Sequence, residues 1–350
     1  MNKRLLTLID KLISTHSLDT AEYEYLIADR CDESVQLLQQ KADEVRRKIY
    51  KNEVYLRGLI EISNICKNDC LYCGIRRSNR SCERYRLTKE QIFSCCENGY
   101  SLGFRTFVLQ GGEDAYSTDE IMCDIIGSIK QRYPDCAITL SLGERSRESY
   151  KAMFDAGADR YLLRHETATK EHYEKLHPDD MSFDNRVKCL HELKQIGYQT
   201  GCGFMVGSPF QTDAYIANDL KFIETFSPDM CGIGPFIPHN ATPFAEMPQG
   251  TLELTLYLLS VIRLIKPNIL LPATTALGTI DPLGREKGIL AGGNVVMPNL
   301  SPVSVRKKYE LYDNKICTGE EAAECRGCLE RRMKSIGFYT SASRGDAIKT

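Results

Sequence analysis

The sequence predicts an α/β protein whose core is an eight-stranded (β/α)8 barrel of the TIM type. Short apolar runs alternate with amphipathic helical segments from about residue 54 to about residue 312. Eight such strand–helix units follow one another at the spacing of parallel β/α crossovers. No low-complexity linker divides the 350 residues, a length that suits one large barrel. A doubly wound open sheet is the alternative.

The chain order gives three regions. Residues 1–50 carry apolar side chains at helical spacing, as in Leu5, Ile9 and Leu12, and are expected to form an N-terminal helical cap. The barrel is expected over residues 51–312. Residues 313–350 are expected to be a C-terminal tail packed on the barrel.

The expected strands are residues 54–63, 106–110, 137–141, 160–164, 198–206, 230–234, 269–273 and 295–297. The expected helices are residues 88–100, 117–129, 149–156, 170–196 with a break near Pro178, 212–226, 252–265, 285–291 and 305–312. Two capping boxes, Thr88-x-x-Gln91 and Ser117-x-x-Glu120, predict where the first two barrel helices begin.

Composition excludes several classes of function. The chain has 45 basic and 47 acidic residues, so its net charge of −2 predicts neither nucleic-acid nor membrane binding. The N-terminus lacks the apolar core of a signal peptide. The longest apolar run, residues 252–265, contains Glu253 and Arg263 and is too short to span a bilayer. We therefore expect a cytoplasmic protein.

Fifteen cysteines are many for a cytoplasmic chain, where disulfides are rare. Six of them fall into two tight triplets. The other nine are scattered and are expected to be small buried apolar residues: Cys31, Cys82, Cys95, Cys96, Cys123, Cys136, Cys189, Cys202 and Cys231.

The first triplet, Cys66-x3-Cys70-x2-Cys73, directly follows the first expected strand. Three thiolates within so few residues can hold three corners of one metal centre, and no nearby residue supplies a fourth. A structural zinc site normally has four closed ligands. An iron–sulfur cluster on three cysteines instead leaves one iron open for another ligand. The spacing therefore favours such a cluster.

The second triplet, Cys317-x7-Cys325-x2-Cys328, lies in the tail. It also lacks an adjacent histidine. A second iron–sulfur cluster is the first interpretation, a zinc site the second, and three unligated thiols the third.

In a (β/α)8 barrel the active site lies at the C-terminal ends of the strands. Polar and glycine residues gather there, as in Gly111-Gly112-Glu113 after the second strand. On the fourth strand, alternation places Arg160, Arg164 and Glu166 on the inner face. Buried charges are costly unless they are paired or used. Arg164 and Glu166 either form an internal ion pair or belong to an anion-binding cavity.

The residues named so far resemble the radical S-adenosylmethionine (SAM) superfamily. The likeness rests on Cys66-x3-Cys70-x-Tyr72-Cys73 and on Gly111-Gly112-Glu113. In that superfamily three cysteines hold a 4Fe–4S cluster, and SAM binds the fourth iron. Reductive cleavage of SAM then yields a 5′-deoxyadenosyl radical. The resemblance thus explains the missing fourth ligand.

Within the superfamily the chain resembles the HydE family of FeFe-hydrogenase maturases, near biotin synthase and methylornithine synthase. The likeness covers nearly the whole chain, most specifically residues 161–168, 232–239, 272–276 and 296–299. It implies a small organometallic or amino-acid substrate, namely a cysteine-bearing iron–carbonyl–cyanide precursor of the hydrogenase cluster. It also implies a flavodoxin or ferredoxin as reductant, other maturation proteins as partners, and a second iron–sulfur cluster in the tail.

The resemblance implies roles for particular residues. The metal ligands are Cys66, Cys70 and Cys73, with Cys317, Cys325 and Cys328 for the tail cluster. The residues expected around SAM are Tyr72, Gln110, Gly111, Gly112, Glu113, Glu166 and Arg186. The residues expected to line the substrate cavity are Arg57, Thr139, Arg160, Arg164, Met205, Thr274, Thr275 and Tyr309. No further catalytic side chain is expected.

Three alternatives compete with a maturase. A related radical SAM mutase or synthase shares the motifs, although a biotin synthase would place its second cluster inside the barrel. A zinc-binding interaction module would use the same cysteines, but the barrel pattern argues against it. A simple electron-transfer iron–sulfur protein would need neither 350 residues nor charged groups inside a barrel.

Overall fold

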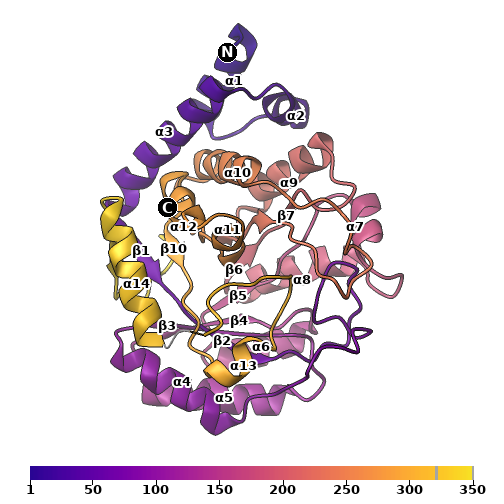
Figure 1. Cartoon of the computed structure of the whole chain (residues 1–350), viewed down its shortest axis with the longest axis vertical. Coiled ribbons are helices and arrows are strands. Elements are labelled where there is room, and N and C mark those ends of the chain that lie inside the picture. Colours follow the sequence, from indigo (N-terminus) through magenta and orange to yellow (C-terminus); the bar gives the residue numbers. More distant parts are fainter. Residues whose placement is uncertain (320–321, 349–350) are drawn as a thin grey trace.

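The computed structural model describes residues 1–319 and 322–348, and of residues 322–325 it describes the backbone alone. Parallel strands occupy the middle of the molecule and helices surround them (Figure 1). The largest sheet holds, in order, β2 (Gly58–Ser63), β3 (Thr106–Gly111), β4 (Ala137–Ser141), β5 (Arg160–Leu162), β6 (Gln199–Cys202) and β8 (Met230–Cys231).

The remaining pairings close this sheet into a ring. Met230 of β8 bridges Leu270, and Pro272 bridges β10 (Val295–Val296). β10 pairs with β1 (Glu53–Leu56), which leads directly into β2, and Leu59 bridges Asn299. All of these pairings are parallel. The predicted barrel is therefore confirmed, since an open sheet would leave two unpaired edges.

Two further short strands extend the ring at the C-terminal ends of its strands, which we call the upper end. β7 (Met205–Val206) continues the fifth expected strand and pairs with β9 (Gly234–Pro235), which continues the sixth. The seventh expected strand is reduced to two isolated bridges, at Leu270 and Pro272. Proline lacks the N–H group that a full ladder needs, which accounts for the interruption.

Alternation along the strands separates two environments. Phe107, Leu109, Ile138, Leu140 and Tyr161 point outward and belong to the main hydrophobic core beneath the helices. Their neighbours in sequence point into the barrel. These inward side chains are largely polar in the upper layer, at the C-terminal ends of the strands, and in the lower layer, at the N-terminal ends. The outer face therefore supplies the packing, whereas the interior carries polar side chains.

The helices that cover the barrel are α4 (Lys89–Ser101), α5 (Asp119–Arg132), α6 (Arg147–Asp155), α7 (Lys170–Leu176), α8 (Phe183–Ile196), α9 (Asp213–Phe226), α10 (Leu252–Ile265), α11 (Thr275–Ile280), α12 (Gly284–Leu290) and α13 (Val303–Arg306). The Thr88 capping box is confirmed. The expected box at Ser117 is wrong, because Thr118 caps α5 by accepting a hydrogen bond from the Ile121 N–H. The expected break near Pro178 is confirmed.

The N-terminal helices α1 (Lys3–Thr15), α2 (Thr20–Ala28) and α3 (Asp32–Tyr50) lie along one side of the barrel (Figure 1). α3 packs on α10, and α2 packs on α9. α10 is consequently buried nearly all round, which explains its almost unbroken apolar sequence. Along the described part of the chain, we find no helix with the length and apolarity needed to cross a membrane.

The expected last helix, residues 305–312, is wrong. α13 ends at Arg306, and residues 307–315, here called the strap, cross the mouth of the barrel in irregular conformation. The strap is held by tertiary hydrogen bonds instead of helical ones: the Gly74 N–H donates to the Leu311 carbonyl at 2.9 Å, and the Asp313 N–H donates to the Pro238 carbonyl at 3.1 Å.

The tail contains structure that the sequence did not predict. α14 (Ala322–Ser335) leads to β11 (Tyr339–Ser341). β11 pairs in parallel with the first part of β1, residues 53–55. Figure 1 shows α14 beside β1 at the edge of the barrel. The chain from residue 342 to residue 348 then runs under the N-terminal ends of the strands, where it contacts Thr106, Arg160 and Gln199.

Candidate active site

The loop that carries Cys66, Cys70 and Cys73 is pinned by charged hydrogen bonds. Arg76 donates to both carboxylate oxygens of Asp69, at 2.8 and 2.7 Å. The same bonds hold the pKa of the Asp69 carboxyl well below its usual range. Arg84 donates to backbone carbonyls within the loop, including those of Asn64 and Ile75. Arg76 and Arg84 therefore fix the shape of the loop.

The three thiols lie close enough to influence one another. Burial, together with the neighbouring Cys66, raises the pKa of the Cys73 thiol to about 12. Burial and then Cys73 raise the pKa of Cys70. Among the described residues, no three ligating side chains converge on a point that one metal ion would occupy. Three neighbouring thiols fit an iron–sulfur cluster, in which each cysteine binds a different iron.

The glycine motif after β3 lies against this loop. A Cβ atom on Gly112 would stand 2.3 Å from the Ile65 carbonyl oxygen and 2.7 Å from Cys66 Cβ, so glycine is required there. The Glu113 N–H points to Cys66 Sγ at 3.4 Å, and the Lys67 N–H donates to the Glu113 carbonyl at 2.9 Å. At Gly111 a Cβ would approach no heavy atom closer than 3.2 Å, so that position is more tolerant.

Arg186 reaches the same region from α8. Its Nε donates to Glu144 at 2.5 Å, and its Nη1 donates to the Arg164 carbonyl at 2.6 Å. The side chain is buried, and the Tyr173 ring lies 6.0 Å from its guanidinium carbon. Sequence reasoning did not single out Glu144, which holds this guanidinium in place.

Tyr72, between Cys70 and Cys73, is joined to a buried histidine. Its hydroxyl lies 3.2 Å from His177 Nε2, and His177 Nδ1 lies 2.9 Å from the Tyr173 carbonyl. Nδ1 must carry the proton that it donates to this carbonyl, so Nε2 accepts from Tyr72. Burial, reinforced by the charge of Arg186, lowers the pKa of His177 to about 3. The sequence indicated a surface or satisfied histidine; it is satisfied, but it lies beside the site.

Apolar side chains cover this part of the loop. Met205, expected in the substrate cavity, packs with Leu176, Phe236 and Phe244 against Leu71 and Tyr72. It therefore supports the cysteine loop from the upper end of the barrel.

The upper layer of the barrel interior is polar. Gln110 Nε2 lies 3.2 Å from the Tyr309 hydroxyl, which the strap brings over the barrel. Glu61, buried in β2, accepts from Asn299 at 2.9 Å and pairs with Lys315 of the strap. The sequence carried a signal for Glu61, a carboxylate at an inward position of an otherwise apolar strand, but nothing local pointed to Lys315.

Arg164 and Glu166 form the internal ion pair that the sequence left open, at 3.0 Å. Glu166 adopts a left-handed backbone conformation with φ of 65°, which is strained for a non-glycine residue and is held by its N–H bond to the Gly203 carbonyl. Nε of Arg164 and the hydroxyls of Thr139 and Thr274 have no hydrogen-bond partner within the described residues. Unpaired buried donors of this kind favour a bound polar ligand.

Three more residues were expected in the substrate cavity, namely Thr275, Arg57 and Arg160. Thr275 begins α11 and accepts a hydrogen bond from Arg285 at 3.3 Å. Arg57 and Arg160 occupy the lower layer of the barrel, where Arg160 donates to Thr106, Gln199, Asp346 and the Arg344 carbonyl. Hydrogen bonds thus hold Arg160 at the lower end of the barrel, while Arg164 lies in the upper layer.

The tail triplet is less enclosed. Cys317 is half-buried, with Arg285 Nη2 at 3.5 Å from its sulfur, and Cys328 is exposed. The side chain of Cys325 lies outside those that the structure describes. Of the nine scattered cysteines, Cys31, Cys82 and Cys123 are half-buried, and the other six are buried as expected.

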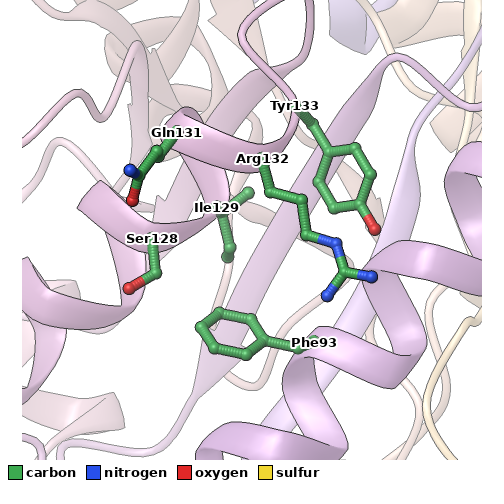
Figure 2. A pocket seen from close by; sticks show the side chains of 6 residues that line it. All are labelled: Phe93, Ser128, Ile129, Gln131, Arg132 and Tyr133. Carbon is green, nitrogen blue, oxygen red and sulfur yellow. The ribbon is translucent and has the colours of Figure 1, made fainter.

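A separate hollow on the outer layer lies between α4 and α5 and is lined by Phe93, Ser128, Ile129, Gln131, Arg132 and Tyr133 (Figure 2). Its position outside the barrel separates it from the cysteine loop, and it offers no cluster of reactive groups.

Comparison with known proteins agrees with this geometry. The family model of the radical SAM superfamily matches residues 60–223. The chain is 47% identical over 296 residues to the FeFe hydrogenase maturase subunit HydE of Thermotoga maritima, covering 85% of this chain and 84% of that one. It is 29% identical over 331 residues to 3-methylornithine synthase of Methanosarcina barkeri, covering 94% and 92%.

Among solved structures, methylornithine synthase (PylB) superposes with a TM-score of 0.84 at 27% identity, covering 95% of this chain and 97% of that one. The maturase HydG shares the fold, with a TM-score of 0.81 at 20% identity, covering 97% and 76%. Fold, cysteine loop and glycine motif together define a radical SAM enzyme. The chain belongs to the family of the FeFe hydrogenase maturase subunit HydE. That superfamily implies a 4Fe–4S cluster and SAM.

Proposed function

We propose that this enzyme acts in the maturation of FeFe hydrogenase and converts a small cysteine-bearing iron–carbonyl–cyanide precursor of the active-site cluster. The observation that carries the proposal is the 47% identity to a HydE maturase over most of both chains. The barrel interior supports it, because unpaired donors on Arg164, Thr139 and Thr274 suit a ligand with anionic and carbonyl-type acceptors.

In this proposal Cys66, Cys70 and Cys73 hold the cluster at the barrel mouth. The bound cluster and SAM supply a 5′-deoxyadenosyl radical when SAM is reductively cleaved. The Gly112 backbone and Gln110, Glu113, Glu166 and Arg186 bind and orient SAM. Tyr72 covers it, with its hydroxyl tied to His177.

The barrel interior beneath the SAM position, here called the chamber, receives the substrate. Arg164, Thr139 and Thr274 hold its polar groups, and Tyr309 on the strap closes the chamber from above. Residues 307–315 and the loops around Gly74 and Pro238 exclude water by lying across the mouth. The proposal extends to a flavodoxin or ferredoxin as reductant and to a second iron–sulfur cluster on Cys317, Cys325 and Cys328.

The alternative is a radical SAM mutase or synthase of the methylornithine synthase or biotin synthase kind. This alternative is supported by the likeness to methylornithine synthase, which covers 95% of this chain and 97% of that one. Both alternatives share the cluster and SAM, and they differ in the substrate that the chamber accepts.

Complementation separates these functions. The gene is placed in three hosts that lack, respectively, the HydE maturase, methylornithine synthase or biotin synthase. Restored hydrogenase activity in the host without HydE supports the proposal. If only one of the other two hosts is rescued, the synthase function of that host replaces the proposal. In parallel, the anaerobically reconstituted protein is given SAM and dithionite. A cluster-loaded sample that forms no 5′-deoxyadenosine rejects radical SAM activity.

A chamber variant tests the substrate assignment. Thr139→Val removes one unpaired hydroxyl and keeps the side-chain shape. We expect maturation to fall about tenfold while SAM cleavage without substrate stays within about twofold. Thr225→Val, on an exposed turn of α9, is the matched control and should change neither.

A further inference from the structure

Residues 165–168, here called the Glu166 segment, follow β5 and contain a strained backbone. Glu166 has a left-handed φ of 65°, which is unfavourable for a residue with a side chain. Its buried carboxylate pairs with Arg164 at 3.0 Å. Burial and then the charge of Glu166 raise the pKa of the Tyr72 hydroxyl, so this carboxylate faces the cysteine loop. The strained backbone therefore determines where the Glu166 side chain lies.

Two hydrogen bonds join the Glu166 segment to Gly203, between β6 and β7. The Glu166 N–H donates to the Gly203 carbonyl at 3.0 Å, and the Gly203 N–H donates to Nδ1 of His165 at 3.2 Å. A Cβ atom on Gly203 would stand 2.1 Å from the Gly232 carbonyl oxygen, so the backbones lie in close contact there. Because Nδ1 of His165 accepts a hydrogen bond, its Nε2 carries the proton.

Asp219 of α9 contacts the Glu166 segment from outside the barrel. Its Oδ1 accepts a hydrogen bond from the Ala168 N–H. The same oxygen lies 3.3 Å from Nε2 of His165, as an electrostatic contact and not an aligned hydrogen bond. The Phe222 ring of the same helix packs on the His165 ring, with 4.7 Å between their centroids. One carboxylate oxygen thus holds both ends of the segment, with Glu166 between them.

Packing alone does not explain a carboxylate at this position. Asp219 is completely buried, and its neighbours Ile216, Leu220 and Ile223 on the buried face of α9 are apolar. An apolar side chain of similar size would avoid the cost of burying a carboxylate. Oδ2 of Asp219 has no hydrogen-bond partner within the described residues. The contacts that Asp219 contributes are therefore those of Oδ1 to the Glu166 segment.

We propose that Asp219 is a positioning residue for SAM: through His165 and Ala168 it holds Glu166 in the left-handed conformation from which the Glu166 carboxylate binds SAM. The inference rests on the proposed function, which places Glu166 on SAM, and it adds a residue on the outer side of the barrel wall. Losing Asp219 should weaken SAM binding because the Glu166 segment relaxes, and not because a contact to SAM is removed.

The test uses the full-length enzyme and its Asp219→Leu variant. Leucine branches at Cγ as aspartate does, but it accepts no hydrogen bond. We expect the SAM dissociation constant of the anaerobically reconstituted enzyme, measured by calorimetric titration, to rise about tenfold. In the protein without SAM, we expect the backbone amides of Glu166 and Ala168 to exchange with deuterium about tenfold faster. If neither quantity changes, the inference is wrong.

A conservative variant and a matched control separate positioning from general support. Asp219→Asn keeps an oxygen in the place of Oδ1, so its SAM affinity should stay within about threefold of the wild type. Ile223→Ala, one turn along α9, lowers stability without removing an acceptor, and its SAM affinity should stay within about twofold. The inference is wrong if Asp219→Asn, or Ile223→Ala, weakens SAM binding as much as Asp219→Leu does.

A double variant completes the design and also serves if Asp219→Leu alone does not fold. His165→Phe combined with Asp219→Leu replaces both members of the buried pair by apolar side chains of similar shape, so the free energy of unfolding should return toward the wild-type value. SAM affinity should stay low, because Ala168 is still not held. Recovery of SAM affinity together with stability would show that Asp219 only supports the fold.

Failure of the proposed function gives a different result. If the wild-type enzyme binds no SAM and forms no 5′-deoxyadenosine, the proposed function fails. The amide exchange of Glu166 and Ala168 then decides by itself whether Asp219 holds the Glu166 segment.

Discussion

The two cysteine triplets both end in a Cys-x2-Cys pair but have very different surroundings. Cys66, Cys70 and Cys73 lie on a loop held by Arg76, by Arg84 and by the strap. The tail triplet has a half-buried Cys317 and an exposed Cys328. The first triplet is therefore pre-organised by several elements of the fold, whereas the second is more open to solvent at Cys328.

This difference teaches what makes a cysteine motif a reactive centre. Spacing brings thiolates within reach of one cluster, but the neighbouring groups decide whether a cofactor is oriented and shielded from water. In the proposed site, Gly112, Arg186 and His177 are those neighbours. The predictions below compare the two triplets, beginning with the largest expected effect.

Cys70→Ser removes one cluster ligand at the mouth. We expect 5′-deoxyadenosine formation to fall by roughly 10³-fold, because serine rarely replaces a thiolate on iron. The measurement is product analysis after anaerobic reconstitution, with circular dichroism to show that the barrel is intact. A folded variant that still cleaves SAM at the wild-type rate would contradict the assignment.

Arg186→Lys tests the neighbours of the first triplet. Lysine keeps the charge but cannot donate to Glu144 and to the Arg164 carbonyl in the same fixed geometry, so we expect SAM cleavage to fall about 10²-fold. Steady-state rates at several SAM concentrations provide the measurement. Arg332→Lys is the matched control near the tail, since Arg332 pairs with Glu286 at 2.6 Å, and it should lose less than about twofold.

His177 provides a test by pH. Its folded pKa of about 3 lies below the value of about 6.5 expected in the unfolded chain. Between these values the unfolded chain binds more protons, so the free energy of unfolding should fall as the pH is lowered, by about 1.4 kcal/mol per pH unit from this group.

The measurement is urea unfolding of the wild type and of His177→Gln between pH 7 and pH 5.5. Glutamine cannot be protonated there, so the variant should lose less stability over the same range. The difference between the two slopes isolates His177 from other groups, including His172, whose pKa burial also lowers. Parallel slopes would show that His177 is not buried as a neutral ring.

Cys328→Ser tests the second triplet and should have the smallest effect. If the tail holds a cluster, iron content should fall, yet SAM cleavage should stay within about twofold, because the contacts that hold the mouth involve residues 307–315 and not Cys328. Iron analysis and electron paramagnetic resonance give the first quantity, and 5′-deoxyadenosine gives the second. A loss as large as that of Cys70→Ser would show that the two triplets act as one unit.

Much of the site could be predicted because its signals are local. The cysteine spacing, the glycine pair before Glu113 and the inward charges of β5 each occupy a few consecutive residues. Local patterns also predicted the parallel strands and most helices, since apolar periodicity records which face is buried. The expected helix over residues 305–312 failed where tertiary hydrogen bonds to Gly74 and Pro238 replaced helical ones.

The sequence by itself determined the barrel and the cysteine loop, because both follow from short-range spacing, whereas the residues expected around SAM rest on the family resemblance and stay a prediction. Only the tertiary structure decided that Lys315 enters the barrel to meet Glu61, 254 residues earlier, and that Asp346 anchors Arg160, 186 residues earlier. No local pattern encodes such pairs. They form because buried charges require partners, and the closed barrel determines which partners come within reach.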